Sequence, residues 1–66
     1  MKNTVRVERA ILDITQAQLA EKVNVSRQTI NAIESNKYVP STVLALKIAA
    51  VCNKHVDDIF MLEEGD

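Results

Sequence analysis

The amino-acid sequence predicts an all-α fold, and three observations support that prediction. Hydrophobic residues make up 47% of the 66 residues but aromatic residues only 3%, a composition that suits short helices around an aliphatic core. A single glycine and a single proline argue against a disordered or loop-rich chain. Between residues 16 and 35, large apolar residues recur at helical spacing. We therefore expect one domain, residues 1–66, built from five short helices.

The first predicted helix covers residues 4–12 and is expected to support the helices that follow. We expect its apolar side to face the core; it consists of Val5, Ile11 and Leu12, with Val7 as an additional candidate.

Residues 16–35 predict two helices joined by a tight turn. Thr15 is a favourable N-cap for the first of them, which should end near Val23. Asn24 tolerates the left-handed backbone conformation that closes many helices, and Ser26 can cap the next helix, about 27–35. This arrangement is a helix-turn-helix. The large apolar residues, spaced for a shared buried seam, are Leu19, Val23, Val25, Ile30 and Ile33.

The third helix turns a polar face towards solvent when Ile30 and Ile33 are buried. Arg, Gln and Asn can form bidentate hydrogen bonds with guanine and adenine in the major groove, and Thr and Ala suit the thymine methyl group. A merely solvated face is the plainer interpretation, but the absence of carboxylates, the preceding tight turn and the short length favour entry into a groove. The candidate base-contacting residues are Arg27, Gln28, Thr29, Asn31 and Ala32.

A fourth and a fifth helix follow. Ser41 caps a helix that continues to about Cys52 and is apolar on nearly all sides, so it should be central to the bundle. After a short loop at residues 53–56, Asp57 and Asp58 favour the first turn of a last short helix through the helix dipole. We interpret Cys52 as a buried core thiol, with a redox or dimer-linking role as the alternative.

The run TQAQLAEKVNVSRQTINAIESNKYVPS resembles the Cro/cI-type helix-turn-helix family, also called the XRE family, whose members include phage repressors. The similarity extends from about Val5 to Phe60 and includes the later ALKIA and DDIF segments. It implies a lambda-repressor-like domain of five helices whose third helix enters the major groove. Two positions depart from the family pattern: Asn24 replaces the usual glycine, and Glu8 replaces a usual apolar residue.

The resemblance also implies roles for single residues. It pairs Arg9 of the first helix with Glu34 at the end of the third, and a partly buried charge would be unfavourable without its partner. It places Gln16 on a phosphate at a helix N-terminus, where free N–H groups favour anions; an ordinary first-turn residue is the alternative. The segment after the third helix gathers donors, a cation and a phenol that suit backbone phosphates, namely Ser35, Asn36, Lys37 and Tyr38.

Charge and composition exclude several classes of function. A net charge of -1 argues against broad, charge-driven binding of nucleic acid, yet most Lys and Arg residues precede residue 40 whereas acidic residues crowd the last ten. We therefore expect a basic face and an acidic back. No apolar run approaches the ~20 residues of a membrane span, and no signal peptide is evident, so a cytoplasmic location is expected. One cysteine and one histidine predict neither an internal disulfide nor a metal site, and no cofactor is expected.

The leading hypothesis is a transcriptional regulator that binds double-stranded DNA, acting as a homodimeric repressor on a palindromic operator. Half-sites about one helical turn apart, ~34 Å, favour a dimer. Its expected interface is the apolar end of the chain, namely Ile59, Phe60, Met61 and Leu62. The alternative is that Ile59 and Phe60 close the core of the monomer. A second hypothesis is a protein-interaction module, such as the antitoxin of a toxin–antitoxin pair, with a small protein partner. Catalysis is not expected, because the chain lacks a nucleophile–base set, a paired-carboxylate site and a glycine-rich phosphate loop.

Overall fold

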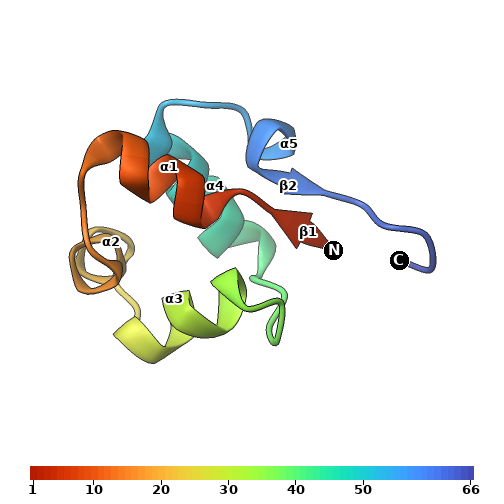
Figure 1. Cartoon of the computed structure of the whole chain (residues 1–66), viewed down its shortest axis with the longest axis horizontal. Helices are drawn as coiled ribbons and strands as arrows, with labels where there is room; N and C mark the ends of the chain where they lie inside the picture. The colour runs from red at the N-terminus through yellow and green to blue at the C-terminus, as the bar shows by residue number, and fades with distance from the viewer.

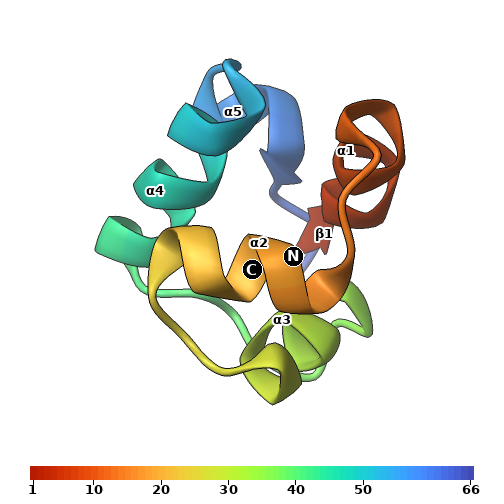
Figure 2. The ribbon, with the colours of Figure 1, turned by 90° about the vertical axis from the view of Figure 1, so that its left-hand side faces the viewer.

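The structure, a computed structural model, describes residues 1–66 and contains five helices in the predicted places (Figure 1). Figure 2 shows α2 crossing in front of α3, with α4 and α5 on one side and α1 on the other. The helical fold class is confirmed. The elements in chain order are β1 (Lys2–Asn3), α1 (Val5–Leu12), α2 (Gln16–Val23), α3 (Arg27–Glu34), α4 (Thr42–Cys52), α5 (Val56–Ile59) and β2 (Phe60–Met61).

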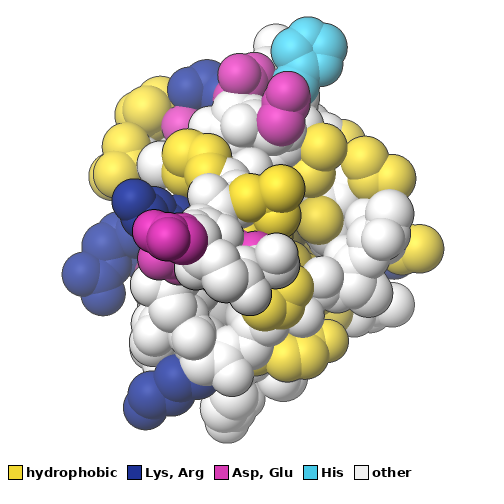
Figure 3. All heavy atoms as spheres, turned by 90° about the vertical axis from the view of Figure 1, so that its right-hand side faces the viewer, with side chains coloured by type: hydrophobic (Ala, Val, Ile, Leu, Met, Phe, Trp, Pro, Cys, Tyr) yellow, Lys and Arg dark blue, Asp and Glu magenta, His cyan; other side chains and the backbone are white.

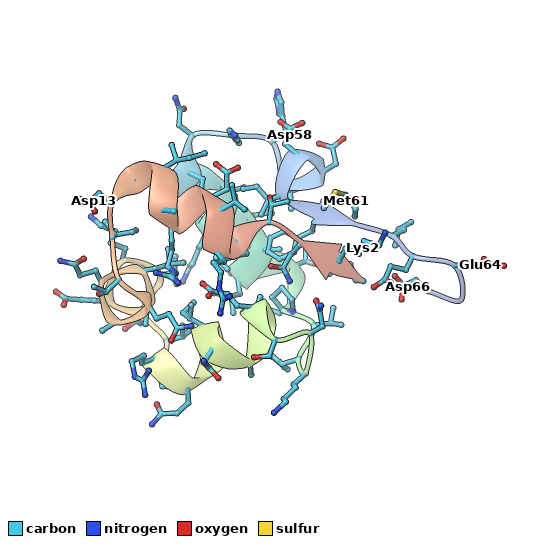
Figure 4. The ribbon with its side chains drawn as sticks, viewed as in Figure 1. Lys2, Asp13, Asp58, Met61, Glu64 and Asp66 are labelled. Atoms are coloured by element: carbon cyan, nitrogen blue, oxygen red, sulfur yellow. The ribbon has the colours of Figure 1, made fainter.

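Two very short strands were not predicted. They pair in antiparallel fashion with Lys2 opposite Met61 and Asn3 opposite Phe60, so the two ends of the chain lie side by side (Figure 4). The Thr4 N–H extends this pairing by donating to the carbonyl of Ile59 at 2.9 Å. Strands of two residues carry no alternating pattern, which is why sequence periodicity missed them.

The seam between α2 and α3 is buried as predicted. Leu19, Ile30 and Ile33 have no exposed surface, Val23 is buried, and Val25 packs half-buried against the same core. Ala20, also buried, lets the following turn return close to α2. The predicted buried thiol is confirmed, because Cys52 belongs to the 13-residue core.

The prediction for α1 was wrong in detail. Val5 is buried, but Val7 is 55% exposed, Ile11 67% and Leu12 40%. The buried position is instead Glu8, because positions three and four residues after Val5 lie on the same side of a helix. The family's usual apolar position therefore does face inward here, and it holds a carboxylate.

A lysine from the α4–α5 loop compensates that carboxylate. Lys54 Nζ lies 2.9 Å from Glu8 Oε2, and this hydrogen bond raises the pKa of Lys54. Burial raises the pKa of the nearby Cys52 thiol, and the negative charge of Glu8 raises it further. The thiol is therefore held in its protonated, less nucleophilic form.

Helices α1 to α4 all end in the same way, although glycine is absent from their ends. Each helix is followed by a residue with positive φ. The N–H of the residue after that one donates to a carbonyl five positions back, at 2.9–3.1 Å, which is a Schellman motif. The sequence predicted this closure at Asn24 and the end of the third helix near residue 35, and it missed the other two. The residues with positive φ are Asp13 (56°), Asn24 (61°), Asn36 (61°) and Asn53 (54°).

These left-handed residues give a first prediction. Asn24→Gly should raise the free energy of unfolding by about 0.5 kcal/mol, because glycine has no Cβ to strain a left-handed turn. Asn24→Ala should lower it by about 1 kcal/mol, since alanine has neither glycine's freedom nor asparagine's polar side chain. Chemical denaturation of the three proteins checks both signs. A glycine variant as unstable as the alanine variant would show that side-chain contacts, and not backbone strain, decide this position.

Candidate nucleic-acid interface

Helix α3 lies at one edge of the molecule, with α1 and α2 above it and no element beyond it (Figures 1 and 2). Ser26 caps its start, because the hydroxyl accepts a hydrogen bond from the Thr29 N–H at 3.2 Å. Ile30 and Ile33 anchor the helix to the core on its inner side. The outer side is consequently free along its full length.

The five candidate base-contacting residues differ in how free their side chains are. Gln28 and Asn31 are exposed, and neither side chain makes a hydrogen bond within the chain. Arg27 is exposed but donates from Nη1 to Gln16 Oε1 at 3.3 Å. Thr29 is half-buried, with its hydroxyl 3.0 Å from that of Ser26 at the start of the helix. Ala32, also half-buried, completes the set.

Glu34 closes α3 inside a cluster of polar side chains, the Glu34 cluster, made by Arg6, Arg9, Gln16 and Glu34. Arg9 donates from Nε to Glu34 Oε2 at 2.6 Å and from Nη2 to Oε1 at 3.1 Å, a bidentate pair. Gln16 Nε2 also donates to Oε1, at 3.1 Å. The Glu34 side chain is only 2% exposed, so these donors replace water.

The charges of this cluster are mutually stabilised. Burial by itself would raise the pKa of Glu34, but the hydrogen bonds from Arg9 and Gln16, together with the charges of Arg9 and Arg6, hold that pKa below its ordinary value of 4.5. The hydrogen bond to Glu34 raises the pKa of Arg9. Both groups therefore remain ionised at neutral pH.

One chain of hydrogen bonds connects both ends of α3. Arg9 and Gln16 meet at the Glu34 carboxylate, and the Gln16 amide oxygen accepts from Arg27 at the opposite end of the helix. A further Arg9 hydrogen bond, from Nη1 to the carbonyl of Ile14 at 3.0 Å, ties in the segment between α1 and α2. The predicted phosphate residue Gln16 is therefore held in place by α3 before any ligand binds.

The segment after α3 presents two kinds of side chain. Ser35 Oγ donates to the carbonyl of Asn31 at 2.6 Å, so its hydroxyl hydrogen is already used within the helix. Asn36 turns the chain in the left-handed conformation, and its Oδ1 accepts from Asn3 Nδ2 at 3.3 Å. Lys37 is exposed, and Tyr38 is 47% exposed. Among the predicted phosphate contacts, these last two are the least restrained.

Sequence reasoning missed two residues beside α3. Arg6 is 79% exposed, and its Nε lies 3.8 Å from Glu34 Oε1. Its signal was present, because Arg6 precedes Arg9 by three residues and so shares its side of α1. Asn3 contacts the end of α3 from β1. No local sequence pattern indicates a contact between two residues that are 30 positions apart.

The acidic residues near the C-terminus lie away from α3. Asp58 is at the opposite side of the molecule, above α5 in Figure 4, and Glu64 and Asp66 lie beyond β2. Glu63 and Asp66 form ion pairs with the N-terminal amine of Met1 at 3.2 and 3.1 Å.

No group of three or more His, Cys, Asp or Glu side chains is placed so that it could hold a metal ion. No helix has the length and apolar character needed to cross a membrane.

Comparison with known proteins agrees with this geometry. The helix-turn-helix family matches residues 5–59. An uncharacterised HTH-type transcriptional regulator of Methanocaldococcus jannaschii is 48% identical over 66 residues, covering all of both chains. The uncharacterised HTH-type transcriptional regulator YgzD of Bacillus subtilis is 48% identical over 64 residues, 97% of each chain. The chain therefore belongs to the XRE-type helix-turn-helix family of DNA-binding transcriptional regulators.

Proposed function

We propose that this protein binds a palindromic DNA operator as a homodimer, with α3 in the major groove, and represses transcription by occupying that site. The observation that supports the proposal most directly is the pair of exposed, unpartnered amides of Gln28 and Asn31 on the free side of α3. Amide side chains recognise adenine through two simultaneous hydrogen bonds, and such contacts distinguish sequences.

We assign each side chain a role according to how strongly hydrogen bonds within the chain restrain it. Gln28 and Asn31 contact base edges, Arg27 contacts a base while Gln16 steadies it, and Thr29 and Ala32 lie at the sides of the helix where a thymine methyl can be met. Phosphate contacts come from both flanks of α3, and they fix the orientation of the helix in the groove. They are assigned to Gln16, Ser35, Asn36, Lys37 and Tyr38.

Selection of bound sequences from random duplex DNA tests the proposal. We expect an enriched site with two-fold symmetry and half-sites about 10 base pairs apart, centre to centre. Binding without any enriched sequence would reject specific recognition. An enriched but asymmetric single site would reject the palindromic homodimer and leave the role of α3 intact.

The dimer interface needs revision from the residues first expected. Ile59 has no exposed surface and Phe60 is buried, because α5 and β2 close the core of the single chain. The expectation therefore does not hold for Ile59. Apolar side chains gather on the face that carries the chain ends (Figure 3). Leu62, which follows β2, is 82% exposed. A shallow groove on this side is lined mainly by apolar residues, namely Met1, Val39, Pro40, Leu46, Val56 and Phe60.

We assign this groove, together with Met61 and Leu62, which follow the lining residue Phe60 in the chain, to the second copy of the chain. Val39 is 61% and Leu46 53% exposed, and such neighbouring apolar surface favours burial. Sedimentation equilibrium at micromolar concentration should give twice the 7.4 kDa mass of one chain. A mass of 7.4 kDa throughout would reject the dimer.

Lys37 provides a prediction specific to phosphate contacts. Lys37→Ala should weaken binding to all duplexes by a similar factor and should reduce the slope of log affinity against log salt by about one, because one counterion fewer is released. Titrations at several salt concentrations measure both effects. Lys22→Ala, which removes an exposed lysine from α2, is the control and should leave the slope unchanged. An unchanged slope for Lys37→Ala would remove this residue from the interface.

A further inference from the structure

Asn3 makes three side-chain hydrogen bonds that join separate parts of the fold. Its Oδ1 accepts from the Val5 N–H at 3.1 Å, at the start of α1. Its Nδ2 donates to the carbonyl of Ile33 at 2.9 Å and to Asn36 Oδ1 at 3.3 Å, at the end of α3. Its backbone is held by β2, because Asn3 lies opposite Phe60 in the strand pair. The side chain is therefore fixed from its own strand and reaches across to α3.

The contacts at α3 fall at its C-terminal end. The Ile33 carbonyl there already accepts from the Asn36 N–H at 3.1 Å, and Asn3 supplies a second donor to the same oxygen. Asn36 has positive φ and directs the chain towards Lys37, whose N–H donates to the carbonyl of Ala32 at 2.9 Å. Asn3 holds the Asn36 side chain at this bend. The bend itself determines where the Lys37 and Tyr38 side chains begin.

We propose that Asn3 is a positioning residue for DNA binding, which holds the end of α3 and the Asn36–Tyr38 segment in the geometry that meets the phosphates. It does so without contacting DNA. The inference rests on the proposed function, since it specifies how the phosphate-contacting segment of that same interface is ordered. It also assigns a role to the β1–β2 pair, because this pair anchors Asn3, whose side chain reaches α3.

The variant Asn3→Ser separates the two roles of this side chain. A serine hydroxyl retains an oxygen for the Val5 N–H but has no amide to reach Ile33 or Asn36. The matched control is Lys2→Ser, a change to the same residue type at the preceding, exposed strand position, whose side chain makes no hydrogen bond or ion pair. Both variants are compared with wild type well below their melting temperatures, so that all three proteins are folded.

The first measurement uses the protein without DNA. In Asn3→Ser, hydrogen exchange of the Lys37 amide should be about tenfold faster, as expected for the loss of a typical hydrogen bond that steadies the segment. The Ile48 amide in the core of α4 reports global unfolding and normalises the comparison. Lys2→Ser should match wild type. Equal normalised exchange in Asn3→Ser and wild type would overturn the inference.

The second measurement uses the selected duplex. Asn3→Ser should bind about five- to tenfold more weakly and with a salt slope lower by up to one, because the phosphate contact of Lys37 is misplaced. The double variant Asn3→Ser/Lys37→Ala should bind more weakly than Lys37→Ala by clearly less than the factor that Asn3→Ser causes alone, since both changes affect the same segment. Additive losses would overturn the inference by showing that Asn3 acts elsewhere. If wild type selects no duplex while Asn3→Ser still exchanges faster at Lys37, the proposed function fails and the ordering of the segment by Asn3 stands.

Discussion

Replacing Arg9 with alanine is expected to lower the free energy of unfolding by about 2 to 3 kcal/mol and the melting temperature by roughly 10 to 20 °C. The change leaves the Glu34 carboxylate, 2% exposed, without its bidentate partner. Breaking a buried ion pair usually costs about 3–5 kcal/mol, and we place this case lower because Gln16 and Arg6 remain beside the carboxylate. Thermal and urea denaturation measure the loss.

Arg6→Ala is the matched control for Arg9→Ala. Arg6 is an arginine of the same helix that faces the same carboxylate, but it is 79% exposed and its Nε lies 3.8 Å away. Exposed pairs contribute about 0–1 kcal/mol, so the melting temperature should change little. Equal effects of the two substitutions would mean that lost helix surface, and not the bidentate pair, sets the stability. An unchanged melting temperature in Arg9→Ala would refute the structural role of the pair.

The pH dependence provides an independent check of the same pair. The pKa of Glu34 is depressed in the folded protein, so its contribution to stability is present above the ordinary value of 4.5 and disappears as the pH falls through the lower, folded value. In Arg9→Ala the main remaining effect is burial, which raises this pKa, and protonation then relieves the unpaired charge. The stability difference between the two proteins should therefore begin to shrink above pH 4.5, where Glu34 of the variant takes up its proton, and should continue to shrink as the pH falls through the depressed wild-type pKa. A difference that stays constant down to pH ~3 would contradict this account.

The positions of the helices could be predicted because their ends are marked by local residue types that cap helices. Thr15, Ser26 and Ser41 each accept a hydrogen bond from a backbone N–H three residues later, and short polar residues in this role are visible in sequence. Asn24 was identifiable for a similar reason. Packing of α2 on α3 followed from apolar spacing, since both helices bury one face only.

The orientation of α1 could not be predicted in the same way. Its apolar residues outnumber its two buried positions, and one of these two holds Glu8 while Val5 holds the other. That choice becomes favourable only through Lys54, 46 residues away in the α4–α5 loop. The Asn3 contacts and the strand pair are equally non-local. Such pairings depend on the assembled fold and leave no periodic trace in either segment.

The candidate interface was predictable in composition but not in the state of each side chain. The sequence predicted a phosphate contact for Gln16 and base contacts for Arg27 and Gln28, but it did not show which of these side chains is restrained. In the folded chain, Gln16 is hydrogen-bonded on both sides, Arg27 is restrained by it, and Gln28 is free. The difference arises because the end of α3, closed by Glu34, meets the start of α2. In the proposed complex with DNA, restraint of this kind would lower the entropy lost on binding.

The free side chain of Gln28 leads to the second large effect that we expect. Gln28→Ala should reduce affinity for the selected duplex by about 1 to 3 kcal/mol for each half-site, which is roughly 5- to 150-fold per half-site, and binding to unrelated duplexes should change far less. The reason is that its amide has no partner in the free protein, so the loss falls wholly on contacts with a base edge. Preference should relax at one base pair in each half-site, which a second selection with the variant would identify.

Two comparisons make this result specific to base contact. Glu21→Ala removes an exposed side chain from α2 and should leave both affinity and preference as in wild type. Because Gln28 is exposed and makes no hydrogen bond within the chain, its removal should also change the free energy of unfolding by no more than about 0.5 kcal/mol, well below the loss expected for Arg9→Ala. A Gln28→Ala protein with unaltered discrimination would exclude its amide from base recognition. The exposed side of α3 would then owe any specificity to Arg27 and Asn31, or to the shape of the DNA that the helix meets.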